Sequence, residues 1–243
     1  MRKLQYFIQK NPFMVILLAL LLVRGVGRGT GGNIWDFILE TLYYLPGIVV
    51  GITVHEFAHA FAAYKLGDNT PKDQGRVTLN PLAHIDPIGL IALIFLHFGW
   101  GKPVQVNPFA FRKNARLCNI VTDLAGVATN FVVAFLFGGL YFFLWRAGVS
   151  LDSAGMMILY YAVVMNLVLM VFNLLPIPPL DGFGVVTEIF DLRRKPWYGS
   201  VYSYGNIILL VVIITGGTSY ILGPAINGLA SFIMGSWNAI LPG

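Results

Sequence analysis

The chain has 243 residues, of which 57% are hydrophobic and only 11% are charged. A typical soluble domain carries about 25% charged residues, so this chain has too few to cover the surface of a water-soluble globule. Intrinsic disorder is excluded for the opposite reason, because there is ample apolar surface to bury. The net charge of +5 is interpreted as basic residues beside a lipid bilayer, not as a nucleic-acid surface. The single cysteine, Cys118, excludes an internal disulfide.

The first half of the chain contains two apolar segments of different length. Residues 13–23 form a short one behind a basic start, and no small-x-small cleavage site follows, so we interpret it as an uncleaved first helix. Residues 34–66 form a mostly apolar segment that is unbroken except for Pro46-Gly47 and is long enough to span a membrane. Both are therefore predicted as membrane helices.

A polar stretch at 67–81 follows, and part of it has a different pattern. Residues 75–80 alternate and contain β-branched side chains, which predicts a short strand or extended edge. Residues 87–98 are apolar but short, which favours a tilted or re-entrant helix. We therefore expect an irregular region between the second and third full spans.

The second half is predicted to hold most of the remaining spans. Both 118–145 and 154–175 are long enough to cross a bilayer. After a proline cluster, a helix is expected to about Phe190, followed by apolar segments at 204–222 and 224–241. The expected fold is all-α: a polytopic membrane helix bundle of about six spans with one short extended segment. We expect one domain over 1–243, with a motif-bearing core at about 34–190 and C-terminal helices at 200–243.

The orientation in the membrane stays open at this point. An alternating scheme of spans divides the 16 Lys and Arg residues almost evenly between the two sides, so the positive-inside rule does not decide. The sequence also leaves open whether the chain forms a homo-oligomer.

An HExxH motif, His55-Glu56-Phe57-Ala58-His59, lies inside the second apolar segment. Residues four apart project from one face of a helix, which suits two imidazoles that share one Zn²⁺. Glu56 then lies beside them, where it can reach a metal-bound water. The alternative is a helix with two satisfied core histidines and a Glu paired to a neighbouring span. Ionisable groups at membrane depth are costly and usually functional, which favours the metal interpretation.

A catalytic zinc site normally has three protein ligands and one open position. His84 and His97 are candidates for the third ligand, and the best acidic candidate is Asp181. Asp181 follows a proline-rich run directly after a predicted span, and irregular backbone at that depth is tolerated only when it is buried in protein or lines a wet cavity. The alternative is an interfacial turn in which Asp181 caps the following helix.

Four motifs follow one another along the chain: HEFAH at 55–59, GRVTLNPLAHIDPIG at 75–89, GWGKPVQVNP at 99–108 and NLLPIPPLDG at 173–182. Together they resemble the site-2 protease family of intramembrane zinc metalloproteases, in a compact form without the PDZ or CBS domain of some relatives. The resemblance implies one Zn²⁺ per chain, with His55, His59 and Asp181 as ligands and Glu56 as the catalytic base. One departure is the segment 126–130, Gly-Val-Ala-Thr-Asn, where the family often has Gly-Pro-x-x-Asn.

The resemblance implies hydrolysis of peptide bonds within or near transmembrane segments of membrane-protein substrates, as in regulated intramembrane proteolysis. Asn173 is the first candidate for holding the oxyanion and Asn130 the second, although both could simply make helix–helix hydrogen bonds. Residues 75–80 could pair with an unwound substrate by strand addition. We expect a multi-pass protein of a prokaryotic cell membrane.

Two other functional classes are weighed against this one. A non-catalytic zinc-binding membrane protein has no need for a Glu inside HExxH. A transporter more often shows paired inverted repeats, and no convincing internal repeat is found. Loss of hydrolysis in Glu56→Gln with metal retained separates catalysis from binding, whereas ion flux that survives the change favours transport.

Overall fold

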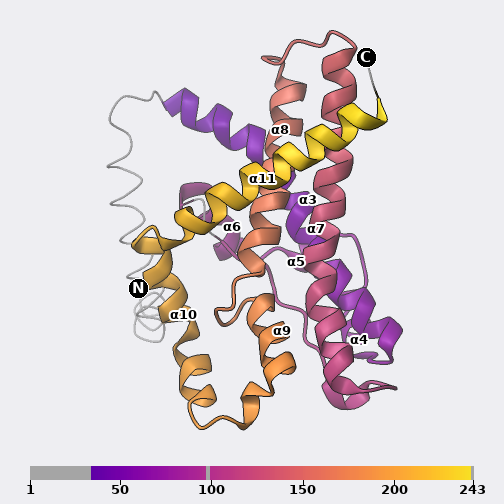
Figure 1. Cartoon of the computed structure of the whole chain (residues 1–243), viewed down its shortest axis with the longest axis vertical. Coiled ribbons are helices and arrows are strands. Elements are labelled where there is room, and N and C mark those ends of the chain that lie inside the picture. The colour runs from indigo at the N-terminus through magenta and orange to yellow at the C-terminus, as the bar shows by residue number, and fades with distance from the viewer. Residues whose placement is uncertain (1–33, 97–98, 242–243) are drawn as a thin grey trace, which may run out of the picture.

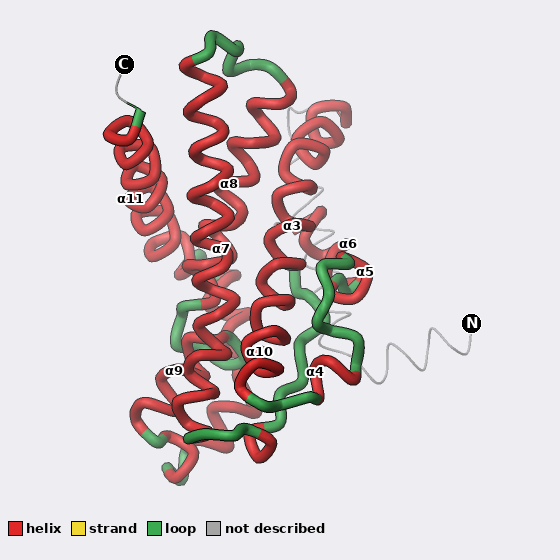
Figure 2. Tube along the Cα trace, turned by 90° about the vertical axis from the view of Figure 1, so that its right-hand side faces the viewer, coloured by secondary structure: helices red, strands yellow, loops and turns green. Residues whose placement is uncertain are grey.

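The computed structural model describes residues 34–96 and 99–241. Within these ranges the chain is helical, and its secondary structure consists of helices joined by loops (Figure 2). The predicted first helix at 13–23 and the candidate ligand His97 lie outside the described residues. The all-α prediction is confirmed for the part of the chain that is described.

Three long helices form the body of the bundle: α3 (Ile34–Leu66), α7 (Ala115–Arg146) and α8 (Ala154–Asn173). Helices α7 and α8 run along the long axis of the molecule, and α3 slants past them and contacts both (Figure 1). Their lengths and hydropathy suffice to cross a membrane, with the candidate spans Ile38–Leu66, Ala115–Arg146 and Ala154–Asn173. Pro46 does not end α3, and small residues allow close packing there: a Cβ on Gly47 would lie 2.6 Å from Cα of Ala162 on α8.

The remaining elements surround this body. Between α3 and α7 lie α4 (Thr70–Asp73), α5 (Pro81–His84), α6 (Pro87–Leu96) and the 3-10 helix η1 (Pro108–Ala110). After α8 come α9 (Asp181–Phe190), the 3-10 helix η2 (Leu192–Arg194), α10 (Tyr198–Ile214) and α11 (Gly217–Ile240). In Figure 1, α9 and α10 lie at the lower end, and α11 crosses obliquely over α7 and α8, which it contacts.

The expected number of about six spans is not confirmed. Three described helices meet the length and hydropathy of a span, and α10 provides a shorter apolar helix. The segment predicted at 204–222 is divided, because α10 ends at Ile214 and α11 begins at Gly217. Gly216 between them has φ +76°, a left-handed conformation that glycine adopts without steric cost and that ends the helix.

The predicted strand at 75–80 is wrong. Gly75 follows α4 with φ +69°, and the amide of Arg76 donates to the carbonyl of Pro71, so the chain turns instead of extending. The Arg76 guanidinium then bonds the carbonyls of Ala83 and Pro103, which ties the segment to its neighbours through side chains. Within the described ranges, β pairing is limited to one isolated antiparallel bridge, between Ile85 and Gly101.

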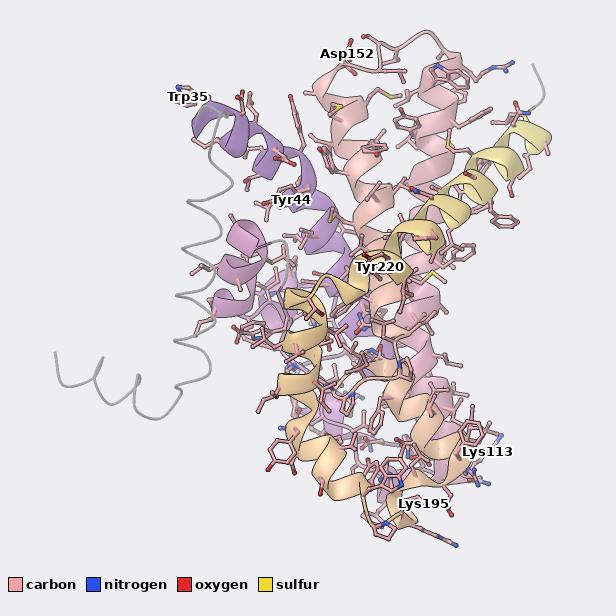
Figure 3. The ribbon with its side chains drawn as sticks, turned by 60° about the vertical axis from the view of Figure 1, so that its left-hand side comes forward. Trp35, Tyr44, Lys113, Asp152, Lys195 and Tyr220 are labelled. Atoms are coloured by element: carbon pink, nitrogen blue, oxygen red, sulfur yellow. The ribbon has the colours of Figure 1, made fainter. Side chains whose placement is uncertain are left out.

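Basic residues gather at one end of the bundle. The amide of Arg112, just before α7, donates to the carbonyl of Leu66 at the end of α3, and the Arg116 side chain reaches the carbonyl of Ile189 near the end of α9. These chain ends therefore lie together, and Figure 3 shows Lys113 and Lys195 at this end with Trp35 and Asp152 at the other. The basic end carries Lys65, Lys72, Arg112, Lys113, Arg116, Arg193, Arg194 and Lys195.

Candidate metal centre

The two histidines of the HExxH motif meet an aspartate from a distant part of the chain. Nε2 of His55 and Nε2 of His59 are 2.9 Å apart on successive turns of α3. Oδ2 of Asp181, the first residue of α9, lies 3.1 Å from His55 Nε2 and 3.3 Å from His59 Nε2. The structure thus brings together the three residues that the motif analysis names as ligands.

The donor set and its spacing fit a zinc ion. Zinc binds His nitrogen and carboxylate oxygen at about 2.0–2.2 Å, and ligands of a tetrahedral ion at that distance are separated by about 3.4 Å. The three observed separations are 2.9, 3.1 and 3.3 Å, close to that value. Within the described parts of the chain, this is the group of three His, Cys, Asp or Glu side chains that could hold a metal ion.

Both histidines are buried, and Asp181 is only partly exposed. Burial opposes ionisation of Asp181, but His59 and His55 beside it outweigh that effect and hold the pKa of the carboxyl below its usual range. Asp181 is therefore an anion at neutral pH, which is the form that binds a metal.

The proline-rich run places Asp181 opposite the HExxH motif. α8 ends at Asn173, and the chain passes through irregular backbone before α9 begins. The residue preceding α9, Leu180, is its N-cap, and the helix has no side-chain cap. The alternative in which Asp181 caps α9 is therefore wrong, because its carboxylate contacts the histidines instead.

Helix α7 supports the site from the other side. The carbonyl of Thr122 lies 2.7 Å from Nδ1 of His59, so this nitrogen donates its proton to the backbone and leaves Nε2 for a metal. One turn further along, Gly126 packs against both imidazoles. A Cβ there would lie 2.5 Å from His59 Nε2 and 2.7 Å from His55 Cε1, so any larger residue displaces the histidines.

The three candidate ligands line a cavity of about 740 Å³. Glu56, half-buried, also lines it, and so does Asn173 at the end of α8. The Asn173 Nδ2 donates to the carbonyl of Leu169 at 2.9 Å, which leaves its second N–H available. The loop after α6 also lines the cavity, through Trp100, Gly101, Pro103 and Val104, and a Cβ on Gly101 would lie 3.4 Å from Glu56 Oε1.

Two other sequence candidates lie elsewhere. Asn130 is completely buried and does not line the cavity, in contrast to Asn173. His84 is also buried, and its Nε2 bonds the carbonyl of Thr78 at 2.7 Å. His84 therefore stabilises the turn before α5 and is not brought to the other two histidines.

Some residues of the site were not singled out from the sequence. Thr122 acts through its backbone carbonyl, which carries no sequence signal. Asp123 lines the cavity and packs against Gly184 of α9, one turn beyond Asp181. Gly126 was noted only as part of the 126–130 motif, and its contact with the histidines gives the physical reason for a glycine at that position.

Comparison with known proteins shows the family to which the chain belongs. Residues 148–216, which include Asn173 and Asp181, match the model of peptidase family M50. The Bacillus subtilis protein named "Putative zinc metalloprotease YwhC" is 37% identical over 202 residues, which cover 82% of this chain and 92% of that protein. The chain therefore belongs to peptidase family M50, the family of the site-2 proteases, and is a zinc metalloprotease of that type.

Mycobacterial relatives cover even more of the chain. The Mycolicibacterium smegmatis protein named "Putative zinc metalloprotease Rip2" is 29% identical over 228 residues, which cover 88% of this chain and 84% of that protein. Its namesake in Mycobacterium tuberculosis strain H37Rv is 27% identical over 242 residues, 91% of this chain and 83% of that protein. No solved structure matches the chain.

Proposed function

We propose that the chain is an intramembrane zinc metalloendopeptidase that hydrolyses peptide bonds within or near transmembrane segments of membrane proteins. The observation that carries the proposal is the meeting of His55, His59 and Asp181 in one cavity with Glu56. When bound there, zinc supplies Lewis-acid polarisation of a carbonyl and lowers the pKa of a coordinated water.

The chain's own residues supply the proton transfer and the positioning. Glu56, which lines the cavity, is our candidate to accept a proton from the attacking water and to return it to the leaving amine. The free N–H of Asn173 is our candidate donor to the oxygen that becomes negative during the attack. Loop residues from 99 to 106 line the same cavity, and we propose that an unwound substrate segment binds along them instead of along residues 75–80.

We further propose that the protein is multi-pass and that its basic end faces the cytoplasm. Membrane proteins retain Lys and Arg preferentially on the cytoplasmic side, and most of the described basic residues, although not Arg146, lie at the end where α3 stops and α7 starts. His59 lies seven residues before the end of α3, about 10 Å along the helix axis. The active site is then nearer the cytoplasmic face than the outer one.

Cleavage of single-span reporter proteins tests both the proposed peptidase activity and the proposed membrane orientation. A panel of reporters of known orientation, each with helix-breaking residues at a different depth, is expressed in cells with the protein or with its Glu56→Gln variant. We expect reporters with breaks in the cytoplasmic half of the span to be cut there, as mapped by mass spectrometry, and only by the unsubstituted chain. Cleavage confined to the outer half contradicts the orientation. A zinc-loaded protein that cuts none of them favours the non-catalytic zinc-binding alternative.

A further inference from the structure

The two histidine ligands differ in what holds their second ring nitrogen. Nδ1 of His59 has the carbonyl of Thr122 at 2.7 Å. Nδ1 of His55 is buried and has no hydrogen-bond partner among the described residues. A metal-binding histidine nearly always donates its remaining N–H to an acceptor, which fixes the ring and its tautomer. His55 therefore calls for an acceptor from a neighbouring element.

Asn130 on α7 is a buried polar group without an assigned role. The residue has no exposed surface, and neither its Oδ1 nor its Nδ2 has a hydrogen-bond partner in the described structure. A buried amide is costly to leave unpaired, so a group of this kind points to an interaction partner close by. Because Asn130 does not line the cavity, that partner is not the substrate.

The geometry of α7 directs Asn130 toward His55. Thr122, Gly126 and Asn130 follow at intervals of four residues and so lie on one face of the helix. Gly126, the middle one, is level with His55, since a Cβ there would lie 2.8 Å from His55 Nδ1. Side chains in a helix lean toward its N-terminus, so the Asn130 amide leans over Gly126, which offers no side chain to block it.

We propose that Oδ1 of Asn130 accepts the Nδ1–H of His55 through one bound water, since the two groups are not in direct hydrogen-bond contact, and that Asn130 is a positioning residue for this ligand. Helix α7 then holds both imidazoles, with the Thr122 carbonyl on His59 and the Asn130 amide on His55. Nε2 of each ring is kept for the metal. The inference rests on the proposed function in one respect, namely that zinc is bound between these rings.

Zinc affinity of the purified full-length protein tests the proposal without the use of catalysis. The zinc dissociation constant is measured by competition with a chromophoric chelator, and the absorption spectrum of the cobalt-substituted protein reports the ligand geometry. We expect Asn130→Leu to weaken zinc binding about 10–100-fold and to change the cobalt spectrum. Asn130→Asp, which keeps an acceptor oxygen, is expected to restore binding to within a few-fold of the unsubstituted chain.

Asn166→Leu is the matched control. Asn166 is also completely buried, but its Nδ2 donates to the carbonyls of Ala162 and Gly47, at 2.8 and 3.4 Å, so that only its Oδ1 lacks a partner among the described residues. We expect Asn166→Leu to lower the thermal stability while zinc affinity stays unchanged. If Asn130→Leu does not fold, Asn130→Ala replaces it in the comparison.

Three results separate the possible failures. Unchanged zinc affinity in the folded Asn130 variants overturns the positioning role. A fall in kcat with unchanged zinc affinity also overturns it, and returns Asn130 to the oxyanion role. An unsubstituted chain that binds no zinc contradicts the proposed function itself, a result that is distinct from the other two.

Discussion

Replacement of Glu56 by glutamine is expected to slow peptide hydrolysis by about 10²–10⁴-fold while one zinc stays bound. Glutamine has the size and shape of glutamate, but its amide cannot accept the proton of the attacking water. The metal remains because Glu56 is not among the three side chains that converge on the candidate centre. The measurement is kcat on a cleaved transmembrane reporter, together with the zinc content of each preparation.

Glu188→Gln provides a control of the same chemistry. Glu188 lies on α9 outside the cavity lining, where its Oε1 accepts from Asn119 and Arg193, at 2.8 Å each. We expect its hydrolysis rate to remain within a few-fold of the unsubstituted chain. If Glu56→Gln retains full activity, Glu56 is not the base. If Glu56→Gln loses its zinc, Glu56 acts as a metal ligand. If ion flux across the membrane persists in Glu56→Gln, the result favours the transporter alternative.

Gly126→Ala is expected to weaken zinc binding by at least 10–100-fold, the range observed when the support of a metal ligand is disturbed. The added methyl group would lie 2.5 Å from His59 Nε2, the atom that binds the metal, and 2.7 Å from His55 Cε1. Both rings must therefore move, or α7 must shift away from α3. Either change disrupts the spacing of the three ligand atoms. Chelator competition measures the affinity, and reporter cleavage measures the loss of activity.

Gly138→Ala on the same helix is the control that separates a local effect on the zinc site from a general loss of stability. Its Cβ would lie 2.5 Å from Cγ2 of Ile233 on α11, far along the helix from the histidines. We expect a lower unfolding temperature from this overpacking and an unchanged zinc affinity. Equal zinc affinity in Gly126→Ala and the unsubstituted chain would contradict the placement of Gly126 against the two ligands.

The sequence predicted the long helices because their signal is local. The segment 34–66 coincides with α3, and the segments 118–145 and 154–175 differ from α7 and α8 by no more than three residues at either end. Length and hydropathy suffice for such elements. His55 and His59 could be paired for the same reason, since their separation is fixed by the helix on which they lie.

The errors concern features that depend on distant parts of the chain. The alternation at 75–80 is compatible with a strand, but a strand requires a partner, and the turn bonds of Arg76 take its place. His84 and Asp181 were both candidates for the third ligand, and only the path of the chain after α8 separates them. Membrane orientation could not be assigned because it depends on which segments cross.

The contribution of α7 to the site also depends on contacts between distant parts of the chain. The Thr122 carbonyl and the absence of a side chain at Gly126 matter only because α7 packs against α3. No periodicity along α7 reveals which of its backbone atoms face a histidine. The candidate ligands could therefore be named from the sequence, whereas the groups on α7 that contact them could not.

The zinc content of the purified protein tests the central claim most directly, because it requires no known substrate. The unsubstituted chain, prepared in detergent without chelators, is measured beside His59→Ala and Asp181→Ala. We expect about one zinc per chain, with binding weakened strongly by either substitution. Zinc that is lost in His59→Ala but kept in Asp181→Ala would contradict the assignment of the third ligand, and an unsubstituted chain without zinc would contradict the account of the protein as a metalloprotease.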